Sequence, residues 1–367
     1  MQPLIKDMIR VTALTRTYGS FKALDAVDLS VAPGEFVTLL GPSGSGKSTL
    51  LNLISGMTEP TAGKIEINGK DATNQPTNQR GLGMVFQNYA LMPHMTVFEN
   101  VAFPLRVRKM PKSEIETRVR DVLRLIQLDH VADRKPKQLS GGQQQRISLA
   151  RCIVYRPSII LMDEPLGALD KKLREDMQLE IKRLHAELGI TMIYVTHDQE
   201  EALAMSDRIV LMRKGRIEQQ GKPEDLYFRP DTLFTADFLG SSNLLKGKIN
   251  STARSLDTAY GTFPLPTARS DEPISGEAVL MIRPESMRLV SDKASAPGAG
   301  LEATVRDSIV LGSFVRHFLE LPGGKRMIVQ EPSGASISRP ARGSTVRIGW
   351  DLDDARLLPT DPDFQNV

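Results

Sequence analysis

A stretch rich in glycine and serine, Gly41–Thr49, constrains the fold of this chain more than any other feature. It reads Gly-Pro-Ser-Gly-Ser-Gly-Lys-Ser-Thr and fits the G-x-x-x-x-G-K-[ST] pattern of a phosphate-binding loop. An apolar run, Phe36–Leu40, precedes it as a predicted buried strand, and a predicted helix, Ser48–Ile54, follows. This order turns backbone N–H groups inward and places the positive end of the helix dipole at the loop. The chain is therefore predicted to bind a nucleotide through its phosphates.

Two side chains of this loop suit that chemistry. The Lys47 ammonium is expected to reach the β- and γ-phosphates, and the Ser48 hydroxyl is expected to bind Mg²⁺. The predicted nucleotide-binding residues of the loop are Gly41, Pro42, Ser43, Gly44, Ser45, Gly46, Lys47, Ser48 and Thr49.

A second apolar run ends in two carboxylates. Ser158–Met162 leads directly into Asp163 and Glu164, and a strand here would deliver both acids to the carboxyl end of the sheet, beside the loop. We expect Asp163 to hold Mg²⁺ and Glu164 to orient or deprotonate an attacking water. His197 follows another predicted strand, Thr191–Thr196, and is expected to stabilise the γ-phosphate.

Strand-like and helix-like segments alternate up to about Leu239, which predicts an α/β core with a largely parallel sheet. Apolar residues at helical spacing predict a helix over Ser113–Leu128, capped by Ser113, and another over Lys171–Leu188. A β-hairpin is predicted from Arg208–Met212 and Arg216–Gln219.

The sequence changes character after Gly240. Short strand-like pieces separated by Gly, Pro, Ser and Asp replace the earlier alternation, and no long helical pattern appears. This spacing predicts a small β-barrel or sandwich. The expected domains are residues 1–240, which bind the nucleotide, and residues 241–367, which are β-rich.

Composition argues against several other classes of protein. With 47 Lys and Arg against 44 Asp and Glu, the net charge of +3 gives no basic excess for a nucleic-acid partner. No apolar run approaches the roughly 18 residues that predict a transmembrane helix, and the first residues lack the apolar region of a signal peptide. Cys152 is the only cysteine, so no internal disulfide forms and a reducing compartment is expected. We therefore expect a soluble, cytoplasmic protein.

A motif farther along indicates the class. Leu139–Arg146 reads Leu-Ser-Gly-Gly-Gln-Gln-Gln-Arg and resembles the signature of ABC ATPases, which other phosphate-loop enzymes lack. Its serine and glycines offer a second anion-binding nest at a helix N-terminus. Two nests in one chain imply a nucleotide held between two copies of it. One copy supplies the loop at Gly41, and the other supplies Ser140, Gly141, Gly142 and Gln143.

The resemblance to ABC ATPases covers residues 8–240 and implies further site residues. Tyr18 matches the aromatic residue that stacks on adenine, and Gln87 matches the Q-loop glutamine near Mg²⁺ and the permease. Asp170 matches the D-loop aspartate at the dimer seam, and His197 matches the switch histidine. None of these positions departs from the family pattern, so an active site is expected. The implied catalytic residues are Lys47, Gln87, Glu164 and His197, and the implied metal ligands are Ser48, Gln87 and Asp163.

The C-terminal part carries a further resemblance. Ile282–Glu285 resembles a motif in the β-rich regulatory domain, of TOBE or OB-like type, of importer ATPases of the maltose-type group. Within that group, Phe86–Asn100 and Thr196–Asp207 are most similar to ATP-binding subunits of spermidine/putrescine importers. Relatives that import iron, sulfate, sugars or phosphonates share both stretches. A polyamine is therefore favoured, and the other solutes stay open.

The resemblance implies ATP and Mg²⁺ as cofactors and an assembly at the cytoplasmic face of the membrane. The implied partners are a second copy of the chain, two transmembrane permease subunits and an extracytoplasmic solute-binding protein that acts through the permease. The permease is expected to dock at Gln87 and the helical stretch Val97–Leu128.

Two alternatives to an importer ATPase remain. A non-transport ABC ATPase acting on DNA or ribosomes would carry coiled-coil insertions or a second ATPase cassette, and the sequence has neither. A binding module without hydrolysis would lack Glu164 or His197, and both are present.

Overall fold

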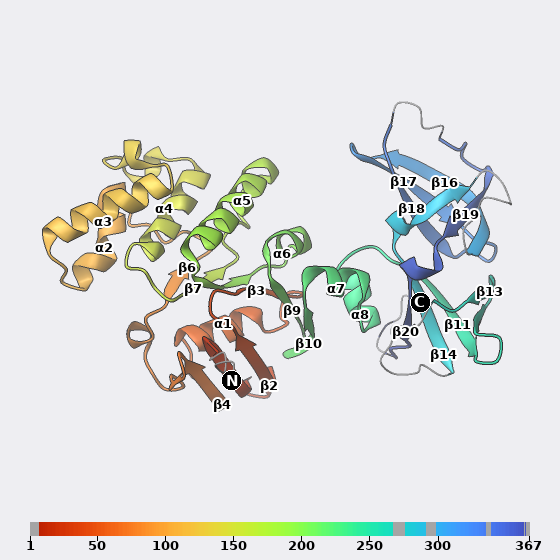
Figure 1. Cartoon of the computed structure of the whole chain (residues 1–367), viewed down its shortest axis with the longest axis horizontal. Helices are drawn as coiled ribbons and strands as arrows, with labels where there is room; N and C mark the ends of the chain where they lie inside the picture. Colours follow the sequence, from red (N-terminus) through yellow and green to blue (C-terminus); the bar gives the residue numbers. More distant parts are fainter. Residues whose placement is uncertain (1–6, 267–275, 291–298, 335–338, 363, 365–367) are drawn as a thin grey trace, which may run out of the picture. The chain divides into compact units, whose positions relative to one another are not determined.

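The computed structural model describes residues 7–266, 276–290, 299–334, 339–362 and 364. The chain divides into two compact units, residues 1–223 and 224–367, whose elements are labelled in Figure 1. The stretch considered for a signal peptide lies partly outside the described residues, because these begin at residue 7. Within the described ranges, no helix is both long and apolar enough to cross a membrane.

A six-stranded sheet organises the first unit. Its order is β10-β9-β3-β8-β7-β6, and every neighbouring pair is parallel except β9 and β10, which form the predicted hairpin. The predicted α/β core with a largely parallel sheet is thus confirmed. The strands are β3 (Phe36–Leu40), β6 (Gly83–Val85), β7 (Ile159–Asp163), β8 (Thr191–Val195), β9 (Arg208–Arg213) and β10 (Arg216–Gly221).

The first unit also contains a four-stranded antiparallel sheet, in the order β2-β1-β4-β5. The spacing of apolar residues predicts only part of one of its strands, β2, through the alternation of Val27, Leu29 and Val31. Register shifts interrupt the pairing of β1 with both of its neighbours, so the alternation of apolar and polar residues is broken along it. Its strands are β1 (Ile9–Tyr18), β2 (Phe21–Val31), β4 (Ala62–Ile67) and β5 (Lys70–Asp71).

Both faces of the parallel sheet are buried, which is why its strands are continuous apolar runs. Along β7, Ile160 and Met162 belong to one hydrophobic cluster with residues of the helices α2 to α5. Ile159 and Leu161 belong to a second cluster, with α1 and the antiparallel sheet. Successive side chains of a strand point to opposite faces, so α1 and α4 lie on opposite sides of the sheet. The helices are α1 (Lys47–Ser55), α4 (Gly141–Ile153), α5 (Lys171–Leu188) and α6 (Gln199–Met205).

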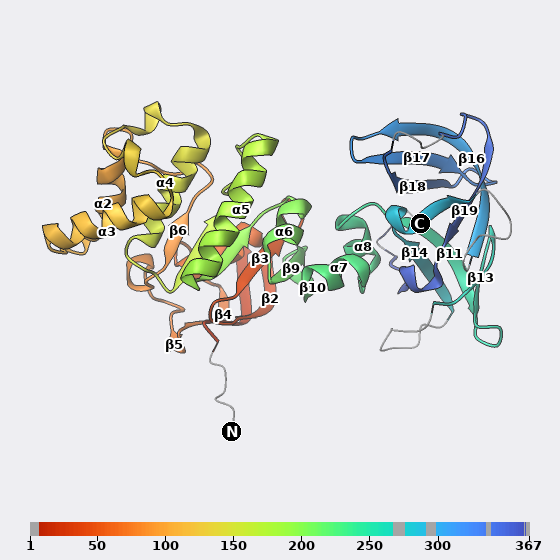
Figure 2. The same cartoon turned by 45° about the horizontal axis from the view of Figure 1, so that its top comes forward.

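The helical stretch expected over Val97–Leu128 consists of two helices, α2 (Val97–Val107) and α3 (Lys112–Leu125). They pack with α4 in a helical group beside the sheet, as Figures 1 and 2 show. The prediction that Ser113 caps the second helix is wrong. The N-cap is Pro111, whose extended backbone (φ −58°, ψ 142°) ends the intervening loop, and no side chain caps the helix.

The second unit contains two five-stranded antiparallel sheets, in the orders β13-β12-β11-β14-β20 and β15-β19-β16-β17-β18. The predicted all-β character of the C-terminal region is confirmed. The first sheet comprises β11 (Asn243–Asn250), β12 (Ser255–Thr258), β13 (Gly261–Pro264), β14 (Glu277–Ile282) and β20 (Ala355–Pro359). The second comprises β15 (Met287–Val290), β16 (Ala299–Val310), β17 (Phe314–Glu320), β18 (Arg326–Pro332) and β19 (Thr345–Trp350).

Two short helices, α7 (Pro223–Phe228) and α8 (Leu233–Phe238), precede these sheets. Leu280 and Ile282 of β14 belong to the core formed with the second sheet, whereas Val279 and Met281 cluster with residues of α8. This packing explains why the second compact unit begins at residue 224, ahead of the expected domain boundary at residue 240. As a boundary between functional domains, residue 240 stays a prediction.

Arg283, the second residue of the Ile282–Glu285 motif, fastens α7 and α8 to this sheet. Its side chain is 2% exposed and donates to the carbonyl oxygens of Tyr227 and Ala236, each at 2.8 Å. The guanidinium also lies 4.2 Å from the centroid of the Tyr227 ring. Because a buried cation is costly unless it is hydrogen-bonded, these contacts fix the segment that leads into the β-rich region.

Candidate nucleotide site

The loop Gly41–Thr49 connects β3 to α1 at the carboxyl end of the parallel sheet. Gly46 is the N-cap of α1 with φ 106°, a backbone region that disfavours residues with a side chain. A Cβ atom on Gly46 would lie 2.7 Å from the Leu24 Cδ2 and 2.8 Å from the Ala23 carbonyl oxygen. No side chain caps α1, so the positive end of its dipole faces the loop without a covering group.

Lys47 is folded back into this loop. The residue is 5% exposed, and its ammonium donates to the carbonyl oxygens of Gly41 at 2.8 Å and Pro42 at 3.0 Å. Burial lowers the pKa of Lys47, while the Glu164 and Asp163 carboxylates raise it. An ammonium has three donors, so one remains for an anion. The Ser45 hydroxyl oxygen is buried and has no hydrogen-bond partner among the described residues. Both groups fit the phosphates of a nucleotide.

The residues expected to hold Mg²⁺ meet where β7 ends. The Ser48 hydroxyl donates to the Asp163 Oδ1 at 3.2 Å, although the two residues are far apart in the sequence. Burial raises the pKa of Asp163, and the hydrogen bond from Ser48 opposes that shift. Oxygen ligands of this kind suit Mg²⁺. Gln87 is exposed just after β6, and its Nε2 lies 3.5 Å from where a Cβ of Gly167 would be, so it adjoins the loop that follows Glu164.

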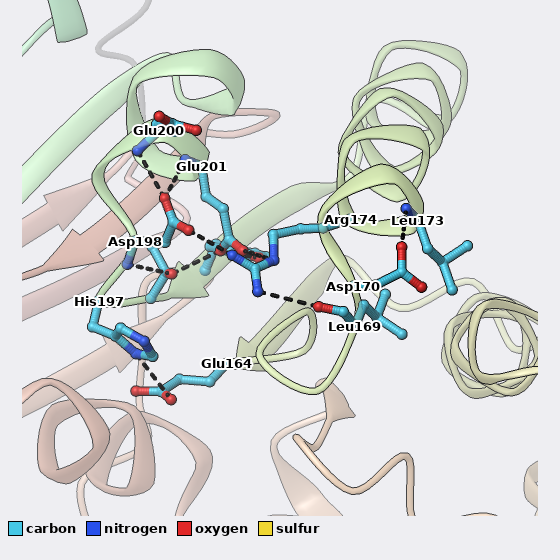
Figure 3. A network of polar contacts seen from close by, with 11 residues as sticks. Glu164, Leu169, Asp170, Leu173, Arg174, His197, Asp198, Glu200 and Glu201 are labelled. Atoms are coloured by element: carbon cyan, nitrogen blue, oxygen red, sulfur yellow. Dashed lines mark hydrogen bonds and ion pairs between the residues drawn. The ribbon is translucent and has the colours of Figure 1, made fainter. Parts of the chain in front are cut away.

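The predicted catalytic pair is also brought together. The Glu164 Oε2 lies 3.2 Å from the His197 Nδ1, as Figure 3 shows. Glu164 has φ 45°, and its N–H donates to the Val195 carbonyl oxygen at 3.0 Å. A non-glycine residue in this region costs about 1–3 kcal/mol, and such strain concentrates at functional sites. The φ of Glu164 and its backbone hydrogen bond to Val195 fix the start of the loop that follows β7.

The signature motif caps its own helix. The Ser140 hydroxyl accepts from the Gln143 N–H at 3.4 Å, and the Gln143 side-chain oxygen accepts from the Ser140 N–H at 3.1 Å. Ser140 is exposed, Gly141 is half-buried, and Gly142 packs so closely that a Cβ there would lie 2.6 Å from the Leu173 Cδ1. These residues sit at the start of α4, across the sheet from α1.

Three other predicted residues have local roles in the single chain. Tyr18 is 48% exposed at the end of β1, as a stacking residue must be, and the Arg16 guanidinium lies 4.5 Å from its ring centroid. The Asp170 side chain caps α5 by accepting from the Leu173 N–H at 3.0 Å. Thr49 is half-buried in the first turn of α1.

Sequence reasoning missed a polar network behind His197, formed by Arg174, Asp198 and Glu201. Arg174 donates to the Asp198 Oδ2 at 2.9 Å and lies 3.8 Å from the Glu201 Oε1. A signal for it exists in the sequence. Basic residues at the start of α5 oppose the preference of a helix N-terminus for negative charge, and the N-cap Asp170 is the acid that offsets them there.

Comparisons with known proteins agree with this site. A family model described as ABC transporter matches residues 24–167, and one described as TOBE domain matches residues 280–358. The chain is 45% identical over 360 residues to the spermidine/putrescine import ATP-binding protein PotA of Thermobifida fusca, covering 96% of this chain and 93% of that protein. It is 43% identical to the protein of the same name from Marinobacter nauticus, covering 98% and 97%.

A solved structure matches the first part of the chain. It is the dimeric post-hydrolysis state of the ATP-binding cassette MJ0796 bound to ADP and Pi, with a TM-score of 0.53 and 39% identity. The match covers 59% of this chain and 99% of that chain. Given this similarity and the phosphate-binding loop beside two strand-end acids, the chain belongs to the ABC transporter ATP-binding protein family and is an ATP-hydrolysing transporter ATPase.

Proposed function

We propose that two copies of this chain form a homodimer that powers the import of a polyamine such as spermidine or putrescine. The named import proteins, similar over nearly their whole length, support the solute class. Import of another small solute is the alternative, because the solute is not expected to touch this subunit. Similarity to transport proteins across both units weighs against a role on DNA or ribosomes.

The assembly that we propose is peripheral, on the cytoplasmic face of the membrane. Two permease subunits dock on the helical group near Gln87, and an extracytoplasmic solute-binding protein acts through the permease. Phe103 and Val107 of α2 support this docking surface, since they are 39% and 63% exposed. Clustered apolar side chains in solvent commonly mark a protein interface. Residues 241–367 are proposed to regulate the ATPase.

Within each copy, we propose that Lys47 and the Gly41–Ser48 backbone hold the phosphates of ATP and that Ser48, Asp163 and Gln87 would hold Mg²⁺. The metal ion, when bound, neutralises negative charge on the phosphates. Glu164 accepts a proton from the attacking water, and His197 orients Glu164 and stabilises the γ-phosphate. The 3.2 Å contact between Glu164 and His197, beside the buried Lys47, is the observation that carries this proposal.

The signature residues complete the site of the other copy in this proposal. Ser140 to Gln143 begin α4, on the opposite side of the sheet from α1, so the two nests of one chain are set apart from each other. A dimer related by two-fold symmetry brings the loop of one copy to the signature of its partner, with Asp170 at the seam. ATP then holds the dimer closed until hydrolysis releases it.

The variant Glu164→Gln tests the proposed chemistry. We expect it to bind MgATP as tightly as wild type but to turn over roughly 10²–10⁴-fold more slowly, because a positioned general base contributes about that factor. ATPase rates of the assembled transporter measure the effect. Glu187→Gln, at a half-exposed position on α5, is the matched control and should keep the wild-type rate. A Glu164→Gln rate close to wild type would remove Glu164 from its proposed role.

A further inference from the structure

Arg174 joins the loop that starts at Glu164 to the turn that carries His197. From the first turns of α5, its guanidinium donates to the Asp198 Oδ2 at 2.9 Å and to the Leu169 carbonyl oxygen at 3.2 Å. Figure 3 shows the side chain reaching across between these two segments. One planar group thus bonds the residue next to His197 and the residue next to Asp170.

Glu201 also holds the turn that carries His197, through hydrogen bonds from two hydroxyl groups. It is 3% exposed and accepts from the Thr196 hydroxyl at 2.7 Å and the Tyr194 hydroxyl at 2.8 Å. The Thr196 hydroxyl oxygen in turn accepts from the Asp198 N–H at 3.0 Å. Burial raises the pKa of Glu201, and the two hydroxyl groups oppose that shift. Arg174 is the cation nearest to this buried acid in the network, at 3.8 Å.

The loop from Glu164 to Asp170 is consequently held at both ends. At its start, the Glu164 N–H donates to the Val195 carbonyl oxygen, and at its end Arg174 holds Leu169. The contact of Glu164 with His197 lies between these anchors. Its geometry therefore depends on how firmly the loop and the turn are kept together.

We propose that Arg174 is a positioning residue for ATP hydrolysis, which holds the His197 turn against the Glu164 loop. The inference rests on the proposed roles of Glu164 and His197. In the described part of the chain, Arg174 forms no hydrogen bond or ion pair with either of them, so it acts through Asp198 and Leu169. The forked guanidinium is needed for both bonds at once. A lysine keeps the charge but, as a point donor, does not reproduce the fork.

A purely structural role for Arg174 predicts different behaviour. Removing the cation would then lower stability and active fraction without a specific effect on turnover. A positioning role instead lowers kcat and leaves the KM for ATP unchanged, because the phosphate loop and adenine contacts are untouched. The two roles are separated by kcat and KM measured on folded protein of known active fraction.

The experiment compares Arg174→Met, Arg174→Lys and His197→Ala in the assembled transporter. For Arg174→Met we expect kcat to fall roughly tenfold to a hundredfold, the scale on which displaced catalytic groups act, with KM changed less than about threefold. Arg174→Lys should recover part of the loss. Arg183→Met is the matched control on α5. Arg183 pairs with Glu180 and Glu187 and donates to the Leu125 carbonyl oxygen, all outside this network, and its replacement should leave kcat unchanged.

A double-mutant cycle with Asp198→Asn tests the contact itself. Asparagine keeps a side-chain oxygen to cap α6, so the fold is retained, but it removes the charged acceptor of Arg174. If both residues act through one contact, the double variant loses no more than about the larger single loss. If Arg174→Met does not fold, Arg174→Lys takes its place in the cycle.

Two outcomes would overturn the role of Arg174 but leave the proposed site intact. One is that the losses of kcat in the two single variants multiply in the double variant. The other is a kcat of Arg174→Met within about twofold of wild type while His197→Ala is inactive. An active His197→Ala would instead overturn the proposed site, and the role of Arg174 with it.

Discussion

The two helix N-termini that are proposed to bind one nucleotide are built in opposite ways. Helix α1 begins at Gly46, with φ 106° and no side-chain cap, and the buried Lys47 lies beside it. Helix α4 begins at Ser140, whose side chain and that of Gln143 cap each other's backbone N–H groups. The first end is open to an anion, whereas the second is satisfied within its own chain.

The difference shows what each end requires. The α1 end is preorganised by its backbone and needs only the nucleotide. In the proposed shared site, the α4 end gives up part of its own cap when it meets a phosphate. The 3.4 Å distance between the Gln143 nitrogen and the Ser140 hydroxyl oxygen is long for a hydrogen bond. Such a weak hydrogen bond is easily replaced by a bond to another acceptor. This suits the proposed role of the α4 end, which is to bind a nucleotide only when a second copy of the chain arrives.

The largest expected contrast is in stability, between Gly46→Ala and Gly142→Ala. At Gly46, the new methyl group meets the Ala23 backbone as well as the Leu24 side chain, and alanine disfavours the positive φ of this position. We therefore expect a loss of about 3 kcal/mol in the free energy of unfolding. At Gly142, it meets the Leu173 side chain, which can rotate, so about 1 kcal/mol is expected. Denaturant unfolding of both variants measures this. Equal losses would mean that the two ends are equally rigid.

The cap of α4 gives a smaller effect. Ser140→Ala should cost about 1 kcal/mol, because a helix loses the side-chain partner of one N–H group. Ser140→Gly should cost only a few tenths of a kcal/mol, since glycine leaves that N–H open to water. Unfolding of the isolated protein, without nucleotide, checks the pair. If both variants were as stable as wild type, the cap would have no part in the fold and the contrast with α1 would weaken.

The smallest expected effect is on the pH dependence of stability. It arises only at the α1 end, because Asp163 lies there. Burial raises the pKa of Asp163 above its unfolded value, so between the two values the folded state holds more of the proton. The free energy of unfolding therefore falls as pH rises through that window. Asp163→Asn removes this fall and should raise Tm at neutral pH. Thermal unfolding at pH 3 to 8 tests it, and a lower Tm at neutral pH would contradict the account.

The sequence allowed the α1 end to be predicted almost completely, because its signals are local. A buried strand, a glycine pattern and a helix follow one another in Phe36–Ile54, and apolar runs mark the strands that carry Asp163 and His197. The parallel order of these strands then brings distant residues such as Ser48 and Asp163 within 3.2 Å. Local sequence patterns were therefore enough to predict the site residues that regular parallel strands bring together.

The features of the fold and of the site that the sequence did not predict depend on long-range packing. Arg174 and Asp198 are 24 positions apart, and only the placement of α5 beside the end of β8 brings them together. The strands β12, β13 and β15 have four residues each and carry too short a pattern for detection. Ser113 failed as a cap because the proline two residues before it already ends the loop. These features follow from tertiary contacts rather than from periodicity.

The most direct test of the shared site combines two variants in one dimer. Lys47→Ala removes the cation from the phosphate loop of one copy, and Ser140→Arg blocks the signature of the other with bulk. In the mixed dimer, both lesions fall on one composite site, and the other site pairs an intact loop with an intact signature. Mixed dimers isolated through two affinity tags are then assayed for occlusion of labelled ATP. We predict about one nucleotide per mixed dimer and almost none in either homodimer. Occlusion no greater than in the Ser140→Arg homodimer would contradict the shared site.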